Sequence, residues 1–154
     1  MKKTTLVYLI KNHQWLMLLR NKKAHDVNHG KWIGVGGKVE DNESVEECAI
    51  REVYEETGYH IDELSYHGIV YFKYADEEIE KMYVYSSKKF HGEEKECDEG
   101  TLAWKKEDEI LNLDLWEGDR IFLQEMIQSH VKPFVYELFY DKDSNLINYR
   151  KLEE

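Results

Sequence analysis

Short apolar runs separated by polar segments organise the first forty residues of the chain. Residues 4–10 and 15–20 are rich in aliphatic and aromatic side chains, and a polar stretch at 11–14 lies between them. This pattern is typical of strands, so we predict a hairpin of two central strands. Residues 21–31 are polar and predict a loop. Residues 32–39 alternate large residues with glycine, which predicts a strand whose backbone passes close to another part of the chain.

A helix is predicted between residues 44 and 58. Ser44 and Glu47 have the spacing of a capping box, in which side chains and backbone N–H groups at a helix start satisfy each other. Gly58 is typical of a helix end. A helix of about four turns fits between these signals.

The second half of the chain repeats the alternation of apolar runs and polar connections. The predicted strands are residues 66–74, 82–90, 101–105, 134–140 and 145–152. The predicted connections are a charged turn at 76–80, an acidic loop at 91–100, a helical turn at 107–111 and a helix that begins near Asp119 and runs through His130. Strands mixed with two helices predict an α/β fold with a mixed β-sheet, formed by a single domain over residues 1–154.

Three glutamates share one face of the predicted central helix. Glu52, Glu55 and Glu56 stand at positions i, i+3 and i+4, so their like charges repel. Either this face is a solvated acidic surface, or a cation neutralises it. Arg51 supplies one positive charge, and a hard divalent cation such as Mg²⁺ takes oxygen ligands of this kind.

Composition narrows the classes of partner. The chain has 21 Lys and Arg against 32 Asp and Glu, a net charge of −11, which argues against a nucleic-acid polymer or an anionic membrane as the main partner. The two cysteines, Cys48 and Cys97, are too few for a disulfide framework or a zinc site, so we expect reduced thiols. No run is long and apolar enough for a signal peptide or a membrane span, and we expect a cytoplasmic protein.

The glutamate face belongs to a longer pattern that resembles the signature of the Nudix hydrolases. All eight fixed positions match, and only Tyr59, where an aliphatic residue is usual, departs mildly. The matching residues are Gly37, Glu43, Arg51, Glu52, Val53, Glu55, Glu56 and Gly58. The resemblance implies an α/β/α sandwich and hydrolysis of a phosphoanhydride bond.

The same resemblance implies a metal site. Glu52, Glu55 and Glu56 would coordinate Mg²⁺, for which Mn²⁺ can substitute, together with the carbonyl of Gly37, whose backbone freedom can turn it toward a cation. Glu99 precedes a glycine and a predicted strand, so it could project into the site as a further ligand. Either Glu52 or Glu99 would act as the base or orient the water.

Other motif residues have supporting roles under this resemblance. Arg51 would orient the catalytic groups through ion pairs with glutamates such as Glu43, which is structural, as is Gly58 at the helix end. Lys38 would contact the substrate beside Gly37. Before any resemblance is considered, Gly37 is equally well read as a glycine in a tight turn.

Further stretches resemble the branch that removes oxidised purine nucleoside triphosphates such as 8-oxo-dGTP, as monophosphate plus pyrophosphate. These are GKWIGVGGK at 30–38, DEG at 98–100 and LWEGD at 115–119. The resemblance implies that Trp116 lines the base pocket, that Asp119 bonds to a purine edge and that Trp32 contacts the substrate. Core packing is the competing reading of both tryptophans. Compared with the mammalian enzymes, Ile33 replaces a base-contacting asparagine and Gly118 replaces the first of two aspartates.

Several alternatives stay open on the sequence alone. Arg20, Lys22 and Lys23 either form a solvated basic patch or neutralise phosphate oxygens. The substrate could be another nucleoside diphosphate derivative, a nucleotide sugar or a dinucleoside polyphosphate. A nucleotide-sensing module without turnover is a third reading, although the complete Arg51 and glutamate set speaks against it. Either a monomer or a homodimer is expected.

Overall fold

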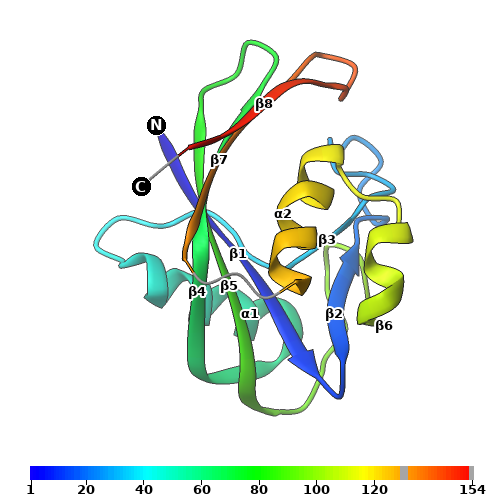
Figure 1. The fold of residues 1–154 in the computed structure, drawn as a ribbon. Coiled ribbons are helices and arrows are strands. Elements are labelled where there is room, and N and C mark those ends of the chain that lie inside the picture. The colour runs from blue at the N-terminus through cyan, green and yellow to red at the C-terminus, as the bar shows by residue number, and fades with distance from the viewer. Residues whose placement is uncertain (129–131, 153–154) are drawn as a thin grey trace.

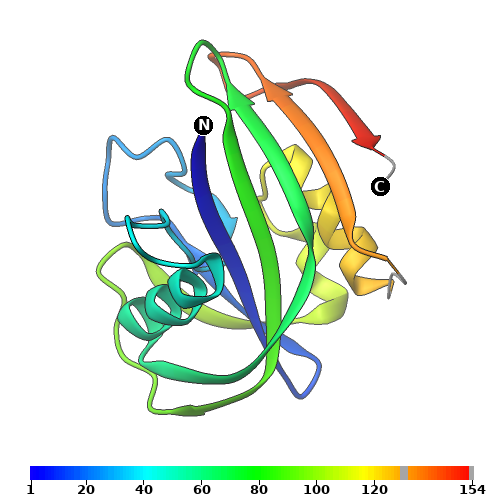
Figure 2. The ribbon, with the colours of Figure 1, turned by 90° about the vertical axis from the view of Figure 1, so that its left-hand side faces the viewer.

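Eight strands form one mixed sheet in the computed structural model, which describes residues 1–128 and 132–152, and helices pack on its two faces (Figures 1 and 2). The strands are β1 (Lys2–Lys11), β2 (Gln14–Leu19), β3 (Trp32–Ile33), β4 (Tyr59–Tyr74), β5 (Glu80–Gly92), β6 (Thr101–Lys106), β7 (Phe134–Tyr140) and β8 (Leu146–Leu152). The helices are α1 (Val45–Thr57), the short 3-10 helix η1 (Glu107–Asn112) and α2 (Glu117–Ile127). The α/β fold with a mixed sheet that we predicted is confirmed.

Strand β1 joins the two parts of the sheet. The strand order is β3-β2-β1-β5-β4-β7-β8, and β6 pairs with β2. β1 runs parallel to β5 over most of its length and meets β2 only at the turn, where Ile10 pairs with Trp15. β4 and β7 are also parallel, whereas the other pairs are antiparallel. The predicted first hairpin exists, but most of the β1 ladder is made with a distant strand.

Each face of the sheet carries its own hydrophobic core. Because successive side chains of a strand point to opposite faces, Val7 packs in the cluster beneath α1 with Val53, while Tyr8 packs in the cluster beneath α2 with Phe122. Both clusters are almost fully buried. The sheet between α1 and α2 therefore forms the centre of an α/β/α sandwich (Figure 2).

The ends of α1 match the sequence signals. The Glu47 N–H donates to Oγ of Ser44 at 3.0 Å, and the Ser44 N–H donates to Oε1 of Glu47 at 2.9 Å, which completes the capping box. Gly58 has a φ of 86°, and its N–H donates to the Tyr54 carbonyl at 2.9 Å. An N-cap such as Ser44 contributes about 1 kcal/mol to the stability of the helix. α1 therefore starts and stops at fixed residues, which fixes the rotation of its glutamates.

The prediction of one strand over residues 32–39 is wrong. Only Trp32–Ile33 is a strand, paired with β2, after which the chain crosses to β1 through isolated bridges of Val35 with Val7 and Lys38 with Thr4. Gly36 allows this crossing, because a Cβ there would collide with the Thr5 carbonyl. The glycine alternation thus marks a change of strand partner rather than one continuous strand.

Other predicted boundaries also moved. The strand predicted at 66–74 begins at Tyr59, because irregularities in its register let one bent strand follow β5 around the sheet. The second helix begins at Glu117, before the predicted Asp119, and ends at Ile127 with a cap at Gln128. The prediction that it continues through His130 falls on residues 129–131, outside the described residues. Among the described residues, no helix has the length and apolarity needed to cross a bilayer.

Candidate active site

Arg51 lies at the centre of the glutamate cluster on α1. Its Nε and Nη2 donate to the two carboxylate oxygens of Glu43 at 2.6 and 3.0 Å, and its Nη1 donates to Glu52 at 2.9 Å and to Glu55 at 3.2 Å. Nη2 also donates to the Lys38 carbonyl at 3.3 Å. Hydrogen bonds from Arg51 lower the pKa of Glu43 to about 2, and Glu43 in turn raises the pKa of Arg51. One guanidinium thus ties the loop before α1 to the acidic face of the helix.

Glu56 is the buried member of the three glutamates. Its Oε2 accepts the Gly36 N–H at 3.0 Å, and the side chain is nearly inaccessible. Burial, followed by the neighbouring carboxyl of Glu99, raises the pKa of Glu56 to about 10. Burial also raises the pKa of Glu52, against the lowering effect of Arg51. The fold therefore holds acidic side chains where a cation would favour their ionised form.

Gly37 passes directly against Glu52. A Cβ at position 37 would lie 2.5 Å from the Glu52 carboxylate carbon, so only glycine leaves room for that carboxylate. Gly37 is not among the residues with positive φ, and its carbonyl accepts the Thr5 N–H at 2.9 Å. Close approach, rather than unusual backbone angles, is what requires glycine here.

The donor set fits a hard divalent cation. Among the residues described, no three His, Cys, Asp or Glu side chains converge as a complete metal site, because Glu52 and Glu55 face Arg51. Mg²⁺ is usually held by one or two carboxylates and completes its coordination shell with water and phosphate oxygens. A site with few protein ligands is therefore enough to bind it. The buried Glu56 beside Glu99, and the Glu52 carboxylate beside Gly37, supply such oxygens.

Basic residues of the loop after β2 reach Glu99. Arg20 places Nη1 3.6 Å from Glu99 and Nε 2.7 Å from Asp26, and Lys23 lies 3.9 Å from Glu99. Lys22 instead donates to the Cys97 carbonyl at 2.6 Å, on the neighbouring loop. Arg20 and Lys23 are thus brought to the acidic cluster, while the Lys22 amine is tied to the chain. Sequence reasoning missed Asp26, which carries no motif signal.

A cleft of about 400 Å³ reaches from Glu56, the buried member of the acidic cluster, to an aromatic pocket. Glu56, Gly37 and Lys38 line one part of it, and Trp116 and Asp119 line another. Further lining residues are Arg20, Val27, Asn28, Ile33, Gly34, Phe72, Tyr74 and Met82. The cleft has the shape and chemistry for a ligand with a charged end and a planar end.

Trp116 belongs to both the core and the cleft wall. Its ring packs edge to face against Phe72, Tyr74 and Tyr140, with centroid distances of 5.1–6.2 Å, and only 5% of the residue is exposed. Its Nε1 donates to Oδ1 of Asn28 at 2.7 Å. The core and pocket readings of Trp116 are therefore compatible. Sequence reasoning missed Asn28, Phe72 and Tyr74, which only the folded chain brings here.

Asp119 lies in the first turn of α2 with a nearly inaccessible carboxyl. Burial raises its pKa to about 7, although Lys31 acts in the opposite direction. The preceding Gly118 donates its N–H to the Tyr140 hydroxyl at 2.7 Å, and a Cβ at Gly118 would collide with Leu138. The space for a side chain at position 118 is thus occupied by β7, which explains the glycine there.

Trp32 is not brought into the cleft. It pairs with Leu19 in the sheet, and Nζ of Lys105 lies 4.6 Å from its ring centroid. Trp32 therefore contacts a neighbouring strand rather than the cleft, and its predicted substrate contact has no geometric support. Lys38, in contrast, lines the cleft next to Gly37.

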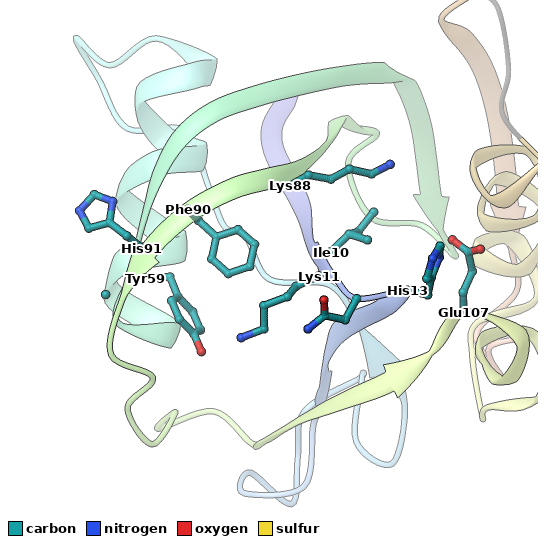
Figure 3. Close-up of a pocket in the computed structure, with 10 residues that line it drawn as sticks. Ile10, Lys11, His13, Tyr59, Lys88, Phe90, His91 and Glu107 are labelled. Atoms are coloured by element: carbon teal, nitrogen blue, oxygen red, sulfur yellow. The ribbon is translucent and has the colours of Figure 1, made fainter.

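A larger groove, of about 630 Å³, lies elsewhere on the molecule (Figure 3). The turn after β1 and the end of β5 form it, and Phe90, Tyr59 and Lys11 face its interior. None of the glutamates of α1 lines it. Size alone therefore does not locate the site, and the smaller cleft is the one that Glu56 of the α1 cluster lines.

Comparison with known proteins agrees with the fold and the acidic cluster. The family model of the NUDIX domain matches residues 2–126, so the chain belongs to the Nudix family and is a Nudix hydrolase. Enzymes of this family act on small nucleotide substrates and generally use divalent metals such as Mg²⁺.

Three relatives illustrate the likeness. The oxidized purine nucleoside triphosphate hydrolase of Mus musculus is 28% identical over 146 residues, which cover 94% of this chain and 90% of the relative. The protein of the same name from Danio rerio is 31% identical over 128 residues, covering 82% and 80%. The crystal structure of a MutT protein from Bacillus halodurans superposes with a TM-score of 0.88 at 28% identity, covering 100% of this chain and 99% of that one.

Proposed function

We propose that this protein is a Mg²⁺-dependent nucleoside triphosphate pyrophosphohydrolase that acts on oxidised purine nucleotides such as 8-oxo-dGTP. The products are the nucleoside monophosphate and pyrophosphate. The observation that carries the proposal is the cleft that joins Glu56 of α1, beside Gly37, to Trp116 and Asp119. The names of the mouse and zebrafish relatives support the same substrate class.

The charged part of the cleft suits a polyphosphate. Glu56 lines the cleft and would hold Mg²⁺ together with Glu52, which lies against Gly37, and Glu99, which lies beside Glu56. Glu55 lies at the solvent side, the Gly37 carbonyl is a further candidate ligand, and Mn²⁺ can replace Mg²⁺. When bound, the metal neutralises phosphate charge and lowers the pKa of water. Lys38 lines the same part of the cleft and offers a cation to the phosphates.

The positions of the acids separate their roles. Glu52 lies against Gly37 and is held by Arg51, so its carboxylate is fixed in direction and suited to orient or deprotonate a water. Glu99 lies between Glu56 and the cations Arg20 and Lys23, which suits it to holding the cluster together. We therefore assign Glu52, rather than Glu99, as the base or water-orienting group.

The aromatic part suits a purine. The ring of Trp116 presents an apolar wall, and the carboxyl of Asp119 lies in the same pocket, where it can exchange a hydrogen bond with a base edge. An enzyme with these features would remove damaged nucleotides before a polymerase uses them, and we propose that it acts in nucleotide-pool sanitation in the cytoplasm.

A substrate panel tests the proposal. The enzyme with Mg²⁺ is given the four canonical deoxynucleoside triphosphates, 8-oxo-dGTP, a nucleotide sugar and a dinucleoside polyphosphate, and the products are separated by ion-exchange chromatography. We expect monophosphate plus pyrophosphate, with kcat/KM for 8-oxo-dGTP about 10-fold or more above the canonical triphosphates. Faster turnover of the sugar or the dinucleoside compound would refute the proposed substrate class, and absence of all turnover would refute the enzyme.

A further inference from the structure

The side-chain amide of Asn28 has a defined orientation at the cleft. The indole nitrogen of Trp116 can only donate, and it lies 2.7 Å from Oδ1 of Asn28. Because only the amide oxygen can accept this hydrogen bond, Oδ1 faces the tryptophan and Nδ2 faces away from it. Within residues 1–128 and 132–152, no group accepts a hydrogen bond from Nδ2. Two N–H donors are therefore free on a side chain that lines the cleft.

The backbone of Asn28 is fixed as well. Its N–H donates to Oδ1 of Asp26 at 3.1 Å, and its carbonyl accepts the Lys31 N–H at 2.9 Å. Asp26 is itself held by Arg20, with 2.7 Å between Oδ2 and Nε, and both side chains are largely buried. Asn28 is thus pre-organised by contacts that exist without a ligand, which reduces the entropy lost when it binds one.

The layout of the cleft suggests which edge of a purine would reach Asn28. A purine is joined to its sugar through N9, and the sugar leads to the phosphates, which the acidic part of the cleft would receive. The atoms farthest from N9 include C6 and its exocyclic group. With the phosphates beside Glu56, these atoms would point toward the aromatic part of the cleft, where Asn28, Trp116 and Asp119 lie.

The exocyclic group at C6 distinguishes two classes of purine. Guanine and hypoxanthine carry a carbonyl oxygen there, which accepts hydrogen bonds, whereas adenine carries an amino group, which donates. When N–H donors of the protein face the amino group of adenine, neither the protein donors nor the amino group has a hydrogen-bond acceptor. Leaving these groups unpaired in a buried site weakens binding. Donors that face a carbonyl pair with it.

We propose that Asn28 is a specificity-determining residue that favours 6-oxo purine nucleotides over 6-amino purine nucleotides through its free Nδ2 donors. This inference rests on the proposed function, because the acidic cluster must receive the phosphates for the base to reach Asn28. Trp116 has a second role under this proposal, since its indole N–H holds the amide in the selective orientation.

The test compares dITP with dATP, two triphosphates whose bases differ in the group at C6 and in the proton at N1. The parent enzyme should show the higher kcat/KM for dITP. Asn28→Ala should reduce the dITP/dATP ratio roughly 5- to 10-fold, through KM rather than kcat, because the base is remote from the reacting phosphate. Asn28→Asp, which turns the donors into acceptors, should shift the ratio toward dATP. An unchanged ratio in both variants would overturn the role of Asn28.

Two further variants separate specificity from general damage to the loop. Trp116→Phe keeps an aromatic ring, although a smaller one, and removes the N–H. It should therefore reduce the ratio as Asn28→Ala does, and the double variant should show no additional loss. His25→Ala changes an exposed residue of the same loop and should leave the ratio as in the parent. Equal ratio changes in His25→Ala and Asn28→Ala would contradict the proposal.

Binding without turnover distinguishes failure of this inference from failure of the proposed function. The dissociation constants of dIMP and dAMP are measured by calorimetry for the parent and Asn28→Ala. An Asn28-dependent preference for dIMP in a protein that hydrolyses neither triphosphate supports the pocket assignment and refutes the hydrolase. Hydrolysis with the same preference in both proteins refutes the role of Asn28 alone.

Discussion

The Arg51 guanidinium donates hydrogen bonds to both carboxylate oxygens of Glu43, from Nε at 2.6 Å and from Nη2 at 3.0 Å. A paired, planar contact of this kind fixes direction as well as distance, and it leaves Nη1 free for Glu52 and Glu55. The loop before α1 is therefore locked to the helix face that carries the acids. Under the proposed function, the geometry of the catalytic acids depends on the ion pair between Arg51 and Glu43, which lies outside the cleft.

Arg51→Lys should uncouple that loop from α1. A lysine keeps the charge but cannot bond to both oxygens of Glu43 while reaching Glu52. We expect a loss of about 2 kcal/mol in the free energy of unfolding, measured by urea denaturation, and a fall in kcat. Arg150→Lys, at an exposed pair with Glu137, is the matched control and should cost under about 0.5 kcal/mol. Equal losses in the two variants would contradict the central role of Arg51.

Glu52→Gln should remove most catalysis and keep the fold. The amide retains the shape of the carboxylate but neither carries its charge nor accepts a proton, so we expect kcat to fall about 10²- to 10⁴-fold. Circular dichroism and the unfolding midpoint should stay close to the parent. The corresponding Glu55→Gln, at a side chain that is 55% exposed, should have a smaller effect. Full activity in Glu52→Gln would remove it from the mechanism.

Two adjacent glycines should respond differently to the same added methyl group. In Gly37→Ala the new Cβ meets the end of the Glu52 side chain, which can move, so activity should fall about 10-fold or more with little change in stability. In Gly36→Ala it meets the Thr5 backbone carbonyl, so the sheet must shift and stability should fall by about 2 kcal/mol or more. Thermal unfolding and pyrophosphate release measure the two effects. The reverse pattern would show that the contact with Glu52 is unimportant.

Mg²⁺ should stabilise the protein through Glu56. The raised pKa of about 10 means that the metal-free fold prefers the protonated acid, so Glu56→Gln should increase the melting temperature without metal at pH 8 by about 5 °C. The parent should gain stability when Mg²⁺ is added, and Glu56→Gln should gain much less. Differential scanning fluorimetry with EDTA and with Mg²⁺ gives both values. An identical response to Mg²⁺ in the two proteins would exclude Glu56 as a ligand.

Asp119 should contribute to a fall in the stability of the protein between about pH 4 and pH 7, beside the contribution of Glu56. Its folded pKa of about 7 lies above the unfolded value of about 3.9, so the folded state keeps a proton that the unfolded state has lost. The stabilisation is complete below pH 4 and is lost as the pH rises to 7, by on the order of 2–4 kcal/mol.

Asp119→Asn isolates this contribution, because the amide does not titrate. The slope of unfolding free energy against pH should flatten in that variant, as followed by denaturant titration from pH 4 to pH 8. Asp76→Asn, at an exposed carboxyl, is the control and should keep the slope of the parent. Glu56, whose pKa is raised to about 10, contributes a slope of the same sign, so part of the slope should remain in Asp119→Asn. A slope as steep as that of the parent in Asp119→Asn would assign the whole titration to other groups.

The boundaries of α1 and the identity of its acids were predictable, because capping signals and helical spacing act over a few residues. The split of residues 32–39 between two strand partners was not, since the two partners lie elsewhere in the chain. The same limit applies to Asn28 and Asp26, which carry no local signal and gain their roles from Trp116 and Arg20.

The sequence by itself determined the Nudix signature, the helix that carries it and the type of chemistry that its carboxylates support. Tertiary structure decided which of those carboxylates is buried, that Arg51 binds three of them, and that Trp116 lines the cleft whereas Trp32 does not. The physical reason is the distance along the chain over which each interaction acts. Hydrogen-bond caps and side-chain spacing act within a turn of helix, but burial and the pKa shifts that follow from it exist only when distant segments pack together.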